Sequence, residues 1–173
     1  DQTIIISTLF DGIFLSSDGG INWTESNSGL SSLVVHELVN DNSTLYSLGD
    51  SHIYCSIDTA KNWISFDSDS LSNGYISAIA VKDSILFIGT SWGELFRTTD
   101  NGENWDHLTS VSTGDLIESI AINGSTMFFN TFDKIYRSTN NSASWSAIMY
   151  GLPNKQIYSY IEVQGTNVYI GIF

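Results

Sequence analysis

Positively charged side chains are scarce in this sequence. Six Lys and Arg stand against nineteen Asp and Glu, which gives a formal net charge of −13 at pH 7. A chain with this charge repels the phosphates of nucleic acids and the headgroups of anionic lipids. We therefore expect no nucleic-acid partner and no attachment to an anionic membrane surface.

Cysteine occurs only once, at Cys55. A single cysteine excludes an internal disulfide and any metal site built from several cysteines. Within an apolar run it is best explained as a small buried side chain, and we give it no catalytic role. The acidic residues make calcium conceivable, but the sequence has no Asp-x-Asp-x-Asp-Gly loop. We therefore expect neither a metal ion nor another cofactor.

Long apolar runs are also missing. No stretch approaches the ~20 apolar residues of a membrane-spanning helix. No basic segment followed by an apolar one opens the chain, as it does in a signal peptide. Hydrophobic residues nevertheless make up 42% of the chain and charged residues only 14%, which excludes a disordered segment. We expect a soluble globular chain with no membrane insertion.

Tryptophan reveals how the chain is organised. Four of the five Trp recur at intervals of 40, 42 and 40 residues, which is the signature of a repeat architecture. Each of the four ends a related octapeptide with the pattern Ser/Thr-x-Asp-x-Gly-x-x-Trp. The characteristic residues of the four octapeptides are Asp18, Gly20, Trp23, Asp58, Trp63, Asp100, Gly102, Trp105, Asn140 and Trp145.

These octapeptides resemble the Asp-box, or bacterial neuraminidase repeat. This repeat is found in sialidases, sortilin-type receptors, photosystem assembly factors and xyloglucan-cleaving glycosidases. In such a box the Asp accepts hydrogen bonds from turn amides, Gly permits a positive φ, and Trp packs against the blade. The second box has Ala60 for Gly, and the fourth has Asn140 and Ser142 for Asp and Gly. We expect these two turns to be less regular.

Short alternating runs around each box predict four strands per repeat. A four-stranded unit of this length buries both faces only by stacking with others around an axis. The predicted fold is therefore all-β, with β-propeller blades of four antiparallel strands that carry Asp-box hairpins. We expect one partial propeller domain over residues 1–173. Its blades are predicted at about 1–30, 31–72, 73–114, 115–153 and, incomplete, 154–173.

The two ends of the chain are irregular. Residues 3–8 match a second strand, so the first blade lacks its inner strand, and the last blade has only its first two. Propellers of the resembling families generally have six, seven or ten blades. We expect a section of a longer propeller, or a piece that self-associates through exposed edge strands at its termini. A closed ring of four blades is the alternative.

Propeller ligands usually bind where loops enter the inner strands and join second to third strands. The boxes lie at the opposite end, so their residues are predicted to be structural. The candidate binding residues are Trp92, Asp11, His52, Glu94 and Asp133. Trp92 lies outside the repeat and is suited to stack on a sugar or anchor a peptide, or else to pack against a neighbouring blade.

The resembling enzymes need residues that this chain largely lacks. A sialidase clamps its substrate with three arginines, but the sequence has only Arg97 and Arg137, at one repeat position. Sialidase activity is therefore rejected. A xyloglucan-type glycosidase needs two facing carboxylates, and no motif singles out such a pair. The basic patch of the photosystem assembly factors is absent.

Two functions remain open. The preferred one is a non-enzymatic module that binds a protein or a glycan, or a structural repeat of a larger secreted or filamentous assembly. The alternative is a fragment of a polysaccharide-active glycoside hydrolase with an Asp-box propeller. An extracellular or cell-envelope location is implied by the resemblance alone.

Overall fold

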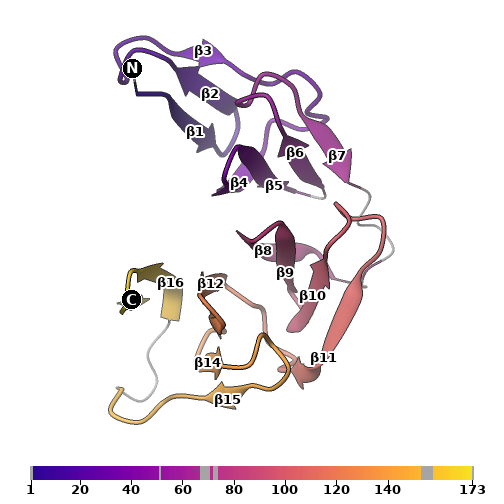
Figure 1. Ribbon diagram of the computed structural model, residues 1–173, viewed down its shortest axis with the longest axis vertical. Coiled ribbons are helices and arrows are strands. Elements are labelled where there is room, and N and C mark those ends of the chain that lie inside the picture. The colour runs from indigo at the N-terminus through magenta and orange to yellow at the C-terminus, as the bar shows by residue number, and fades with distance from the viewer. Residues whose placement is uncertain (1, 51, 67–70, 72–73, 153–157, 173) are drawn as a thin grey trace. The chain divides into compact units, whose positions relative to one another are not determined.

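The structure is a computed structural model (Figure 1). It describes residues 2–50, 52–66, 71, 74–152 and 158–172. These residues form strands and turns, and no helix among them is long and apolar enough to cross a membrane. The chain divides into two compact units, Asp1–Leu71 and Ser72–Phe173, and each is described by itself.

The first unit contains two antiparallel sheets. One has three strands in the order β1-β2-β3, and the other has four in the order β4-β5-β6-β7. Their bounds are β1 (Ile4–Thr8), β2 (Gly12–Ser16), β3 (Thr24–Glu25), β4 (Val35–Asp41), β5 (Thr44–Gly49), β6 (Ile53–Ser56) and β7 (Ile64–Phe66).

The second unit contains two four-stranded sheets and one pair of strands, all antiparallel. The bounds in the first sheet are β8 (Ile76–Lys82), β9 (Ile85–Thr90), β10 (Glu94–Thr98) and β11 (Asp106–Ser112). Those in the second are β12 (Ser119–Asn123), β13 (Thr126–Asn130), β14 (Ile135–Ser138) and β15 (Ser146–Ala147). The pair is β16 (Tyr158–Gln164) and β17 (Asn167–Ile172).

This architecture confirms the predicted fold class. In each four-stranded sheet, the strands lie side by side in the order of the sequence, from an inner strand to an outer strand that follows an octapeptide turn. The β1–β3 sheet lacks the inner strand. The inner strand β12 begins at Ser119, two residues after Ile117. The cause is that Ile117 donates its backbone N–H to Thr90 O, at 3.2 Å, on the preceding sheet.

The strand register repeats from sheet to sheet. The first residue of each octapeptide lies opposite an apolar residue of the second strand. The pairs are Ile4↔Ser16, Leu45↔Ser56, Leu86↔Thr98 and Met127↔Ser138. A slip of one residue in the register would turn every side chain of a strand to the other face of the sheet. The constant register therefore means that residues at the same repeat position face the same side in every sheet.

Both faces of the β12–β15 sheet are buried. Ile120 and Phe129 pack in a cluster with side chains of β8 and β10. Their strand neighbours Ala121 and Phe128 point to the other face and pack in a cluster with Ile161 of β16. Complete burial of a large apolar side chain contributes about 1.5–3 kcal/mol. Stacking therefore stabilises sheets that are too thin to fold alone.

Candidate functional site

The octapeptide turns share one hydrogen-bond scheme. In the first turn, Asp18 Oδ1 accepts bonds from the backbone N–H of Asn22 at 2.9 Å and from Ser16 Oγ at 2.9 Å. Its Oδ2 accepts the amide of Asn22 at 2.7 Å. These bonds, led by the backbone N–H of Asn22, lower the pKa of Asp18 to about 2. The carboxylate is thus engaged within its own turn.

The same bonds recur in the second and third turns. The side-chain amide of Asn62 is the largest cause that lowers the pKa of Asp58 to about 2. The amide of Asn104 likewise lowers the pKa of Asp100. The Asn before the Trp in these three turns is therefore part of the hydrogen-bond scheme, and this role was not predicted. Its signal was an Asn at this position in three of four octapeptides.

The second and fourth turns have the same backbone conformation and hydrogen bonds as the other two, so the expectation that they are less regular was wrong. Ala60 and Ser142 adopt φ of 63° and 65°, in the left-handed region that Gly occupies in the other two turns. The first hydroxyl of each turn accepts their backbone N–H at 3.0 Å. Asn140 takes the place of the carboxylate, with its Oδ1 accepting the N–H of Ser144 at 3.0 Å. These bonds and the burial of Ala60 offset the strained conformation.

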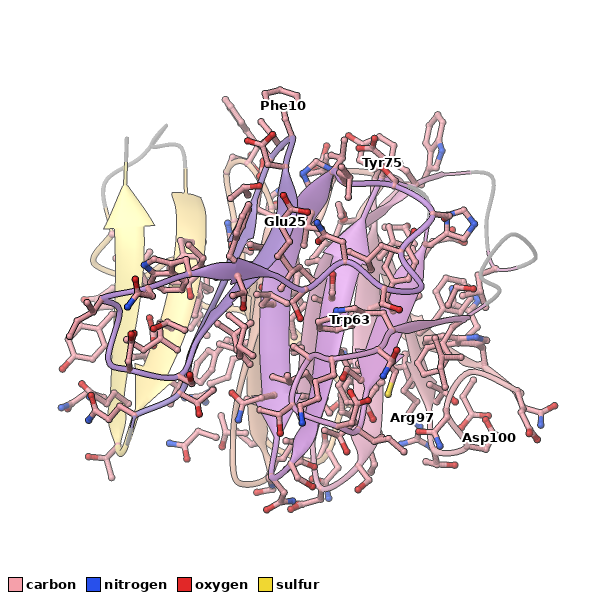
Figure 2. The ribbon with its side chains drawn as sticks, turned by 90° about the horizontal axis from the view of Figure 1, so that it is seen from above. Phe10, Glu25, Trp63, Tyr75, Arg97 and Asp100 are labelled. Atoms are coloured by element: carbon pink, nitrogen blue, oxygen red, sulfur yellow. The ribbon has the colours of Figure 1, made fainter. Side chains whose placement is uncertain are left out.

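The opposite end of each sheet carries the candidate binding loops. We call this the loop end, where the second strand joins the third, at the described residues 9–11, 50, 52, 91–93 and 131–134. The end with the octapeptide turns is the turn end. Figure 2 shows, within the second unit, Tyr75 at the loop end and Asp100 at the turn end.

Trp92 lies at the loop end of the β8–β11 sheet and is 58% exposed. Its indole covers the backbone of Gly74, where an added Cβ would meet Trp92 Cδ1 at 2.1 Å. The neighbouring Tyr75 is 59% exposed, and its carbonyl accepts the N–H of Ser91 at 2.9 Å. Trp92 therefore packs on the entry segment of its own sheet and leaves much of its ring accessible beside Tyr75.

Trp92 has counterparts in two other sheets. Phe10 in the β1–β2 loop is 73% exposed, and Phe132 in the β13–β14 loop is 56% exposed. All three lie at the tip of a loop between second and third strands. Phe10 and Phe132 were not predicted as binding residues. Their signal in the sequence is an aromatic residue at this place in three of the four loops.

The remaining candidates have separate surroundings. Asp11 and Asp133 are exposed, and Asp133 lies 3.5 Å from the ammonium of Lys134. The half-buried Glu94 lies 3.7 Å from His107 Nε2 across the sheet. His52 is half-buried with its ring 6.0 Å from that of Tyr54. In the described part of the second unit, Glu94 and Asp133 thus have different partners and share no contact.

Two loop-end groups were not predicted. His36 Nε2 lies 2.9 Å from Asp50 Oδ1, so this exposed histidine forms an ion pair when it is protonated. Glu118 stands one residue before β12, and partial burial raises the pKa of its carboxyl. Among the described residues, no three His, Cys, Asp or Glu side chains come close enough together to hold a metal ion.

Solved structures of similar fold identify the architecture of these sheets. YCF48 from Cyanidioschyzon merolae matches with a TM-score of 0.76 at 16% identity over 97% of this chain and 62% of its own. YCF48 bound to D1 peptide matches with a TM-score of 0.75 at 13% identity, over 99% of this chain and 59% of that chain.

Two further structures match over almost the whole chain. The GH74 enzyme of Niastella koreensis has a TM-score of 0.76 at 17% identity, covering 98% of this chain and 31% of its own. The extracellular domain of a putative one component system from B. thetaiotaomicron has a TM-score of 0.75 at 18% identity, covering 98% and 25%.

No protein-family model matches the sequence, and comparison with curated proteins gave no significant match. The chain spans less than two thirds of each of these solved structures. At identities this low, the likeness establishes the fold alone. The chain consists of β-propeller blades, four of them carrying an octapeptide turn and a last one made of two strands.

Proposed function

We propose that this chain is a non-enzymatic propeller module that binds a protein or a glycan through the loop end of its blades. The observation that carries the proposal is the recurrence of an exposed aromatic ring at one loop position, in Phe10, Trp92 and Phe132. An exposed aromatic ring forgoes stabilisation that burial would give, about 1.5–3 kcal/mol for a residue such as Phe. Its recurrence at one structural position is best explained by contact with a partner.

The loop chemistry fits either class of partner. Aromatic rings supply large rigid contact areas in protein interfaces and pack against the apolar face of sugars. An acidic residue follows each ring within two positions: Asp11, Glu94 and Asp133. Such carboxylates can accept hydrogen bonds from sugar hydroxyls or from cationic side chains of a protein.

The solved structures support parts of this proposal. One similar propeller, YCF48, has been seen bound to a D1 peptide. Another similar structure is an extracellular domain. We infer an extracellular or cell-envelope location for this chain and assign its octapeptides to the Asp-box class. We also infer that it either binds its partner directly or serves as a structural repeat in a larger assembly.

Self-association through the edge strands is part of the proposal. In the described sheets, β1 is paired on one side only, with β2, and β17 is paired only with β16. An unpaired edge presents backbone N–H and C=O groups that can pair with another chain. Sedimentation equilibrium tests this inference, because a monomer at all concentrations would contradict it.

A glycoside hydrolase fragment is the second candidate, favoured by the likeness to a GH74 enzyme. A glycosidase requires a carboxyl group that stays protonated to act as general acid, beside a second, ionised carboxylate. Burial raises the pKa of Glu118, which makes it the best acid of this kind at the loop end. Within the same unit, Asp133 is the candidate for the second role. Asp11 is the exposed loop-end carboxylate of the first unit.

One experiment separates the two candidates. Wild-type protein is screened on an array of polysaccharides, on an array of peptides, and for the release of reducing sugar from the same polysaccharides. The proposal predicts binding without hydrolysis. Hydrolysis that is lost in Glu118→Gln, Asp11→Asn or Asp133→Asn would establish the enzyme instead. A failure to bind either array would overturn the binding role and leave the structural one.

A further inference from the structure

A pocket of about 310 Å³ opens at the turn end of the second unit, away from the loops discussed above. It lies between the β8–β11 blade and the β12–β15 blade, which contact each other directly. Figure 2 shows Arg97, one of its lining residues, at the turn end, with Tyr75 at the loop end. The pocket is thus separate from the proposed binding loops.

The floor of the pocket is apolar. Phe87 and Met127 line it and are themselves almost fully buried, at 6% and 2% exposure. Ile85 and Ile122 complete the apolar lining from the two blades. The volume is at the lower end of the range for pockets that hold small molecules. It suits a short hydrocarbon chain or a single ring.

The rim carries two cations. Lys82 Nζ donates to Gly124 O, at 2.5 Å, and so ties the turn of one blade to the turn of the next. Arg97 donates from Nε to Asp106 Oδ2 at 3.2 Å. A guanidinium has five N–H donors in a flat fork, and this bond uses one of them. The two terminal nitrogens of Arg97 thus retain donors for a ligand.

The charges near the rim favour a ligand with a single negative charge. Asp83 lies 3.3 Å from Lys82, and Asp106 pairs with Arg97, so the two cations are balanced by two carboxylates. A ligand with two negative charges would face this acidic pair and a chain of net charge −13. Direct hydrogen bonds to Arg97, rather than long-range attraction, would therefore hold the anion.

The next junction between blades lacks this combination. There Asn123, one repeat after Lys82, donates its amide to Gly165 O at 2.5 Å. Arg137 occupies the place of Arg97, but no second cation accompanies it in the corresponding turn. Two of the six cations of the chain thus meet in the pocket between the β8–β11 and β12–β15 blades.

We propose that this pocket binds a small monocarboxylate with an apolar body. The carboxylate lies against the free edge of the Arg97 guanidinium, which matches it in two parallel hydrogen bonds, and beside Lys82. The apolar body occupies the floor against Phe87 and Met127. The pocket lies at the opposite end of the blades from the loops. A negative result for the pocket would therefore leave the proposed loop-end function unaffected, and the reverse also holds.

The test uses 3-phenylpropionate as the probe and 3-phenylpropan-1-ol as its uncharged counterpart. Binding to the full chain is measured by calorimetry and by ligand-observed NMR. We expect saturable binding of the acid, with the alcohol at least about tenfold weaker, because the alcohol cannot form charge-assisted hydrogen bonds with Arg97. Equal binding of the alcohol, or no saturable binding of the acid, would overturn the proposal.

Two arginine variants locate the bound acid. Arg97→Met should weaken binding of the acid at least about tenfold, whereas Arg137→Met, at the matching position of the next blade, should leave it unchanged. Each variant is checked for an unaltered melting temperature. If Arg97→Met unfolds, Arg97→Lys is used, which keeps the charge but removes the fork and should still weaken binding. Undiminished binding in a folded Arg97 variant would rule out this site.

Discussion

The hydroxyl of Ser119 accepts a hydrogen bond at 2.8 Å from the backbone N–H of Ile161 in the next blade. The same hydroxyl donates to Asn130 Oδ1 at 2.7 Å within its own blade. Ser119 and Asn130 are buried, with 3% and 0% exposure. One serine therefore satisfies two buried polar groups across the junction of two blades.

Replacing this serine should destabilise the second unit. Ser119→Ala leaves the N–H of Ile161 and the amide oxygen of Asn130 without this partner, which costs about 1–3 kcal/mol for a buried group. Urea unfolding measures the change in the free energy of unfolding. Ser125→Ala, on an exposed turn of the same blade, is the control and should change it by less than about 0.5 kcal/mol. Equal effects of the two variants would contradict the bridging role.

The tryptophans of the octapeptide repeats should differ in their contribution to stability. Trp63 is 3% exposed and donates from Nε1 to Ser26 O, at 2.8 Å, on the preceding blade. Trp23 is 39% exposed and donates to Gly20 O within its own turn. Trp63→Phe should therefore cost about 1–3 kcal/mol more in the free energy of unfolding than Trp23→Phe. Thermal unfolding measures the stability of the two variants. A larger loss of stability in Trp23→Phe than in Trp63→Phe would contradict the greater contribution of Trp63.

Glycine at position 29 should be irreplaceable. Gly29 has a φ of +92°, and an added Cβ would lie 2.0 Å from Trp63 O, which is backbone and cannot move aside cheaply. Gly19 has a φ of +76° with nothing within 4 Å. Gly19→Ala thus measures the cost of the left-handed backbone alone, about 1 kcal/mol. Gly29→Ala should cost clearly more in chemical denaturation, and similar costs would show that the close approach to Trp63 is unimportant.

Acid should weaken the octapeptide turns. The pKa of Asp18 is lowered to about 2 in the folded chain, against about 3.9 in an unfolded one. The stability that this shift contributes is complete above the unfolded pKa and is lost as pH falls through the folded pKa. Asp18→Asn imitates the natural Asn140 and has no charge to lose. Its unfolding midpoint in urea should fall less than that of the wild type between pH 5 and pH 2. Identical pH profiles would contradict this account.

Much of the fold could be predicted because it depends on patterns within short stretches of the sequence. The period of the tryptophans and the alternation of the strands fixed the four-stranded unit, and the missing inner strand of the first blade followed from the same period. The start of β12 could not be predicted. It depends on the bond from Ile117 to Thr90 on another blade, and alternation along one strand carries no information about such a contact.

The site was harder to predict than the fold for the same reason. Trp92 is conspicuous as the one tryptophan outside the repeat, whereas Phe10 and Phe132 stand out only when the loops of the repeats are compared. That they are exposed, at 73% and 56%, follows from the structure alone. The pairing of His36 with Asp50 joins an inner strand to a loop, so it depends on strand register. The pocket beside Arg97 needs two blades to form and has no signature in either.

The loop-end rings are the centre of the functional account, and the most direct measurement is their effect on binding. Phe10→Ala, Trp92→Ala and Phe132→Ala are compared with the wild type on the polysaccharide and peptide arrays. Ile21→Ala is the control, because this residue is 80% exposed but lies in the first octapeptide turn, at the other end of its blade. We predict that at least one ring variant loses the array signal while Ile21→Ala keeps it. Unchanged signals in all three ring variants, or loss in Ile21→Ala alone, would contradict a binding site at the loop end.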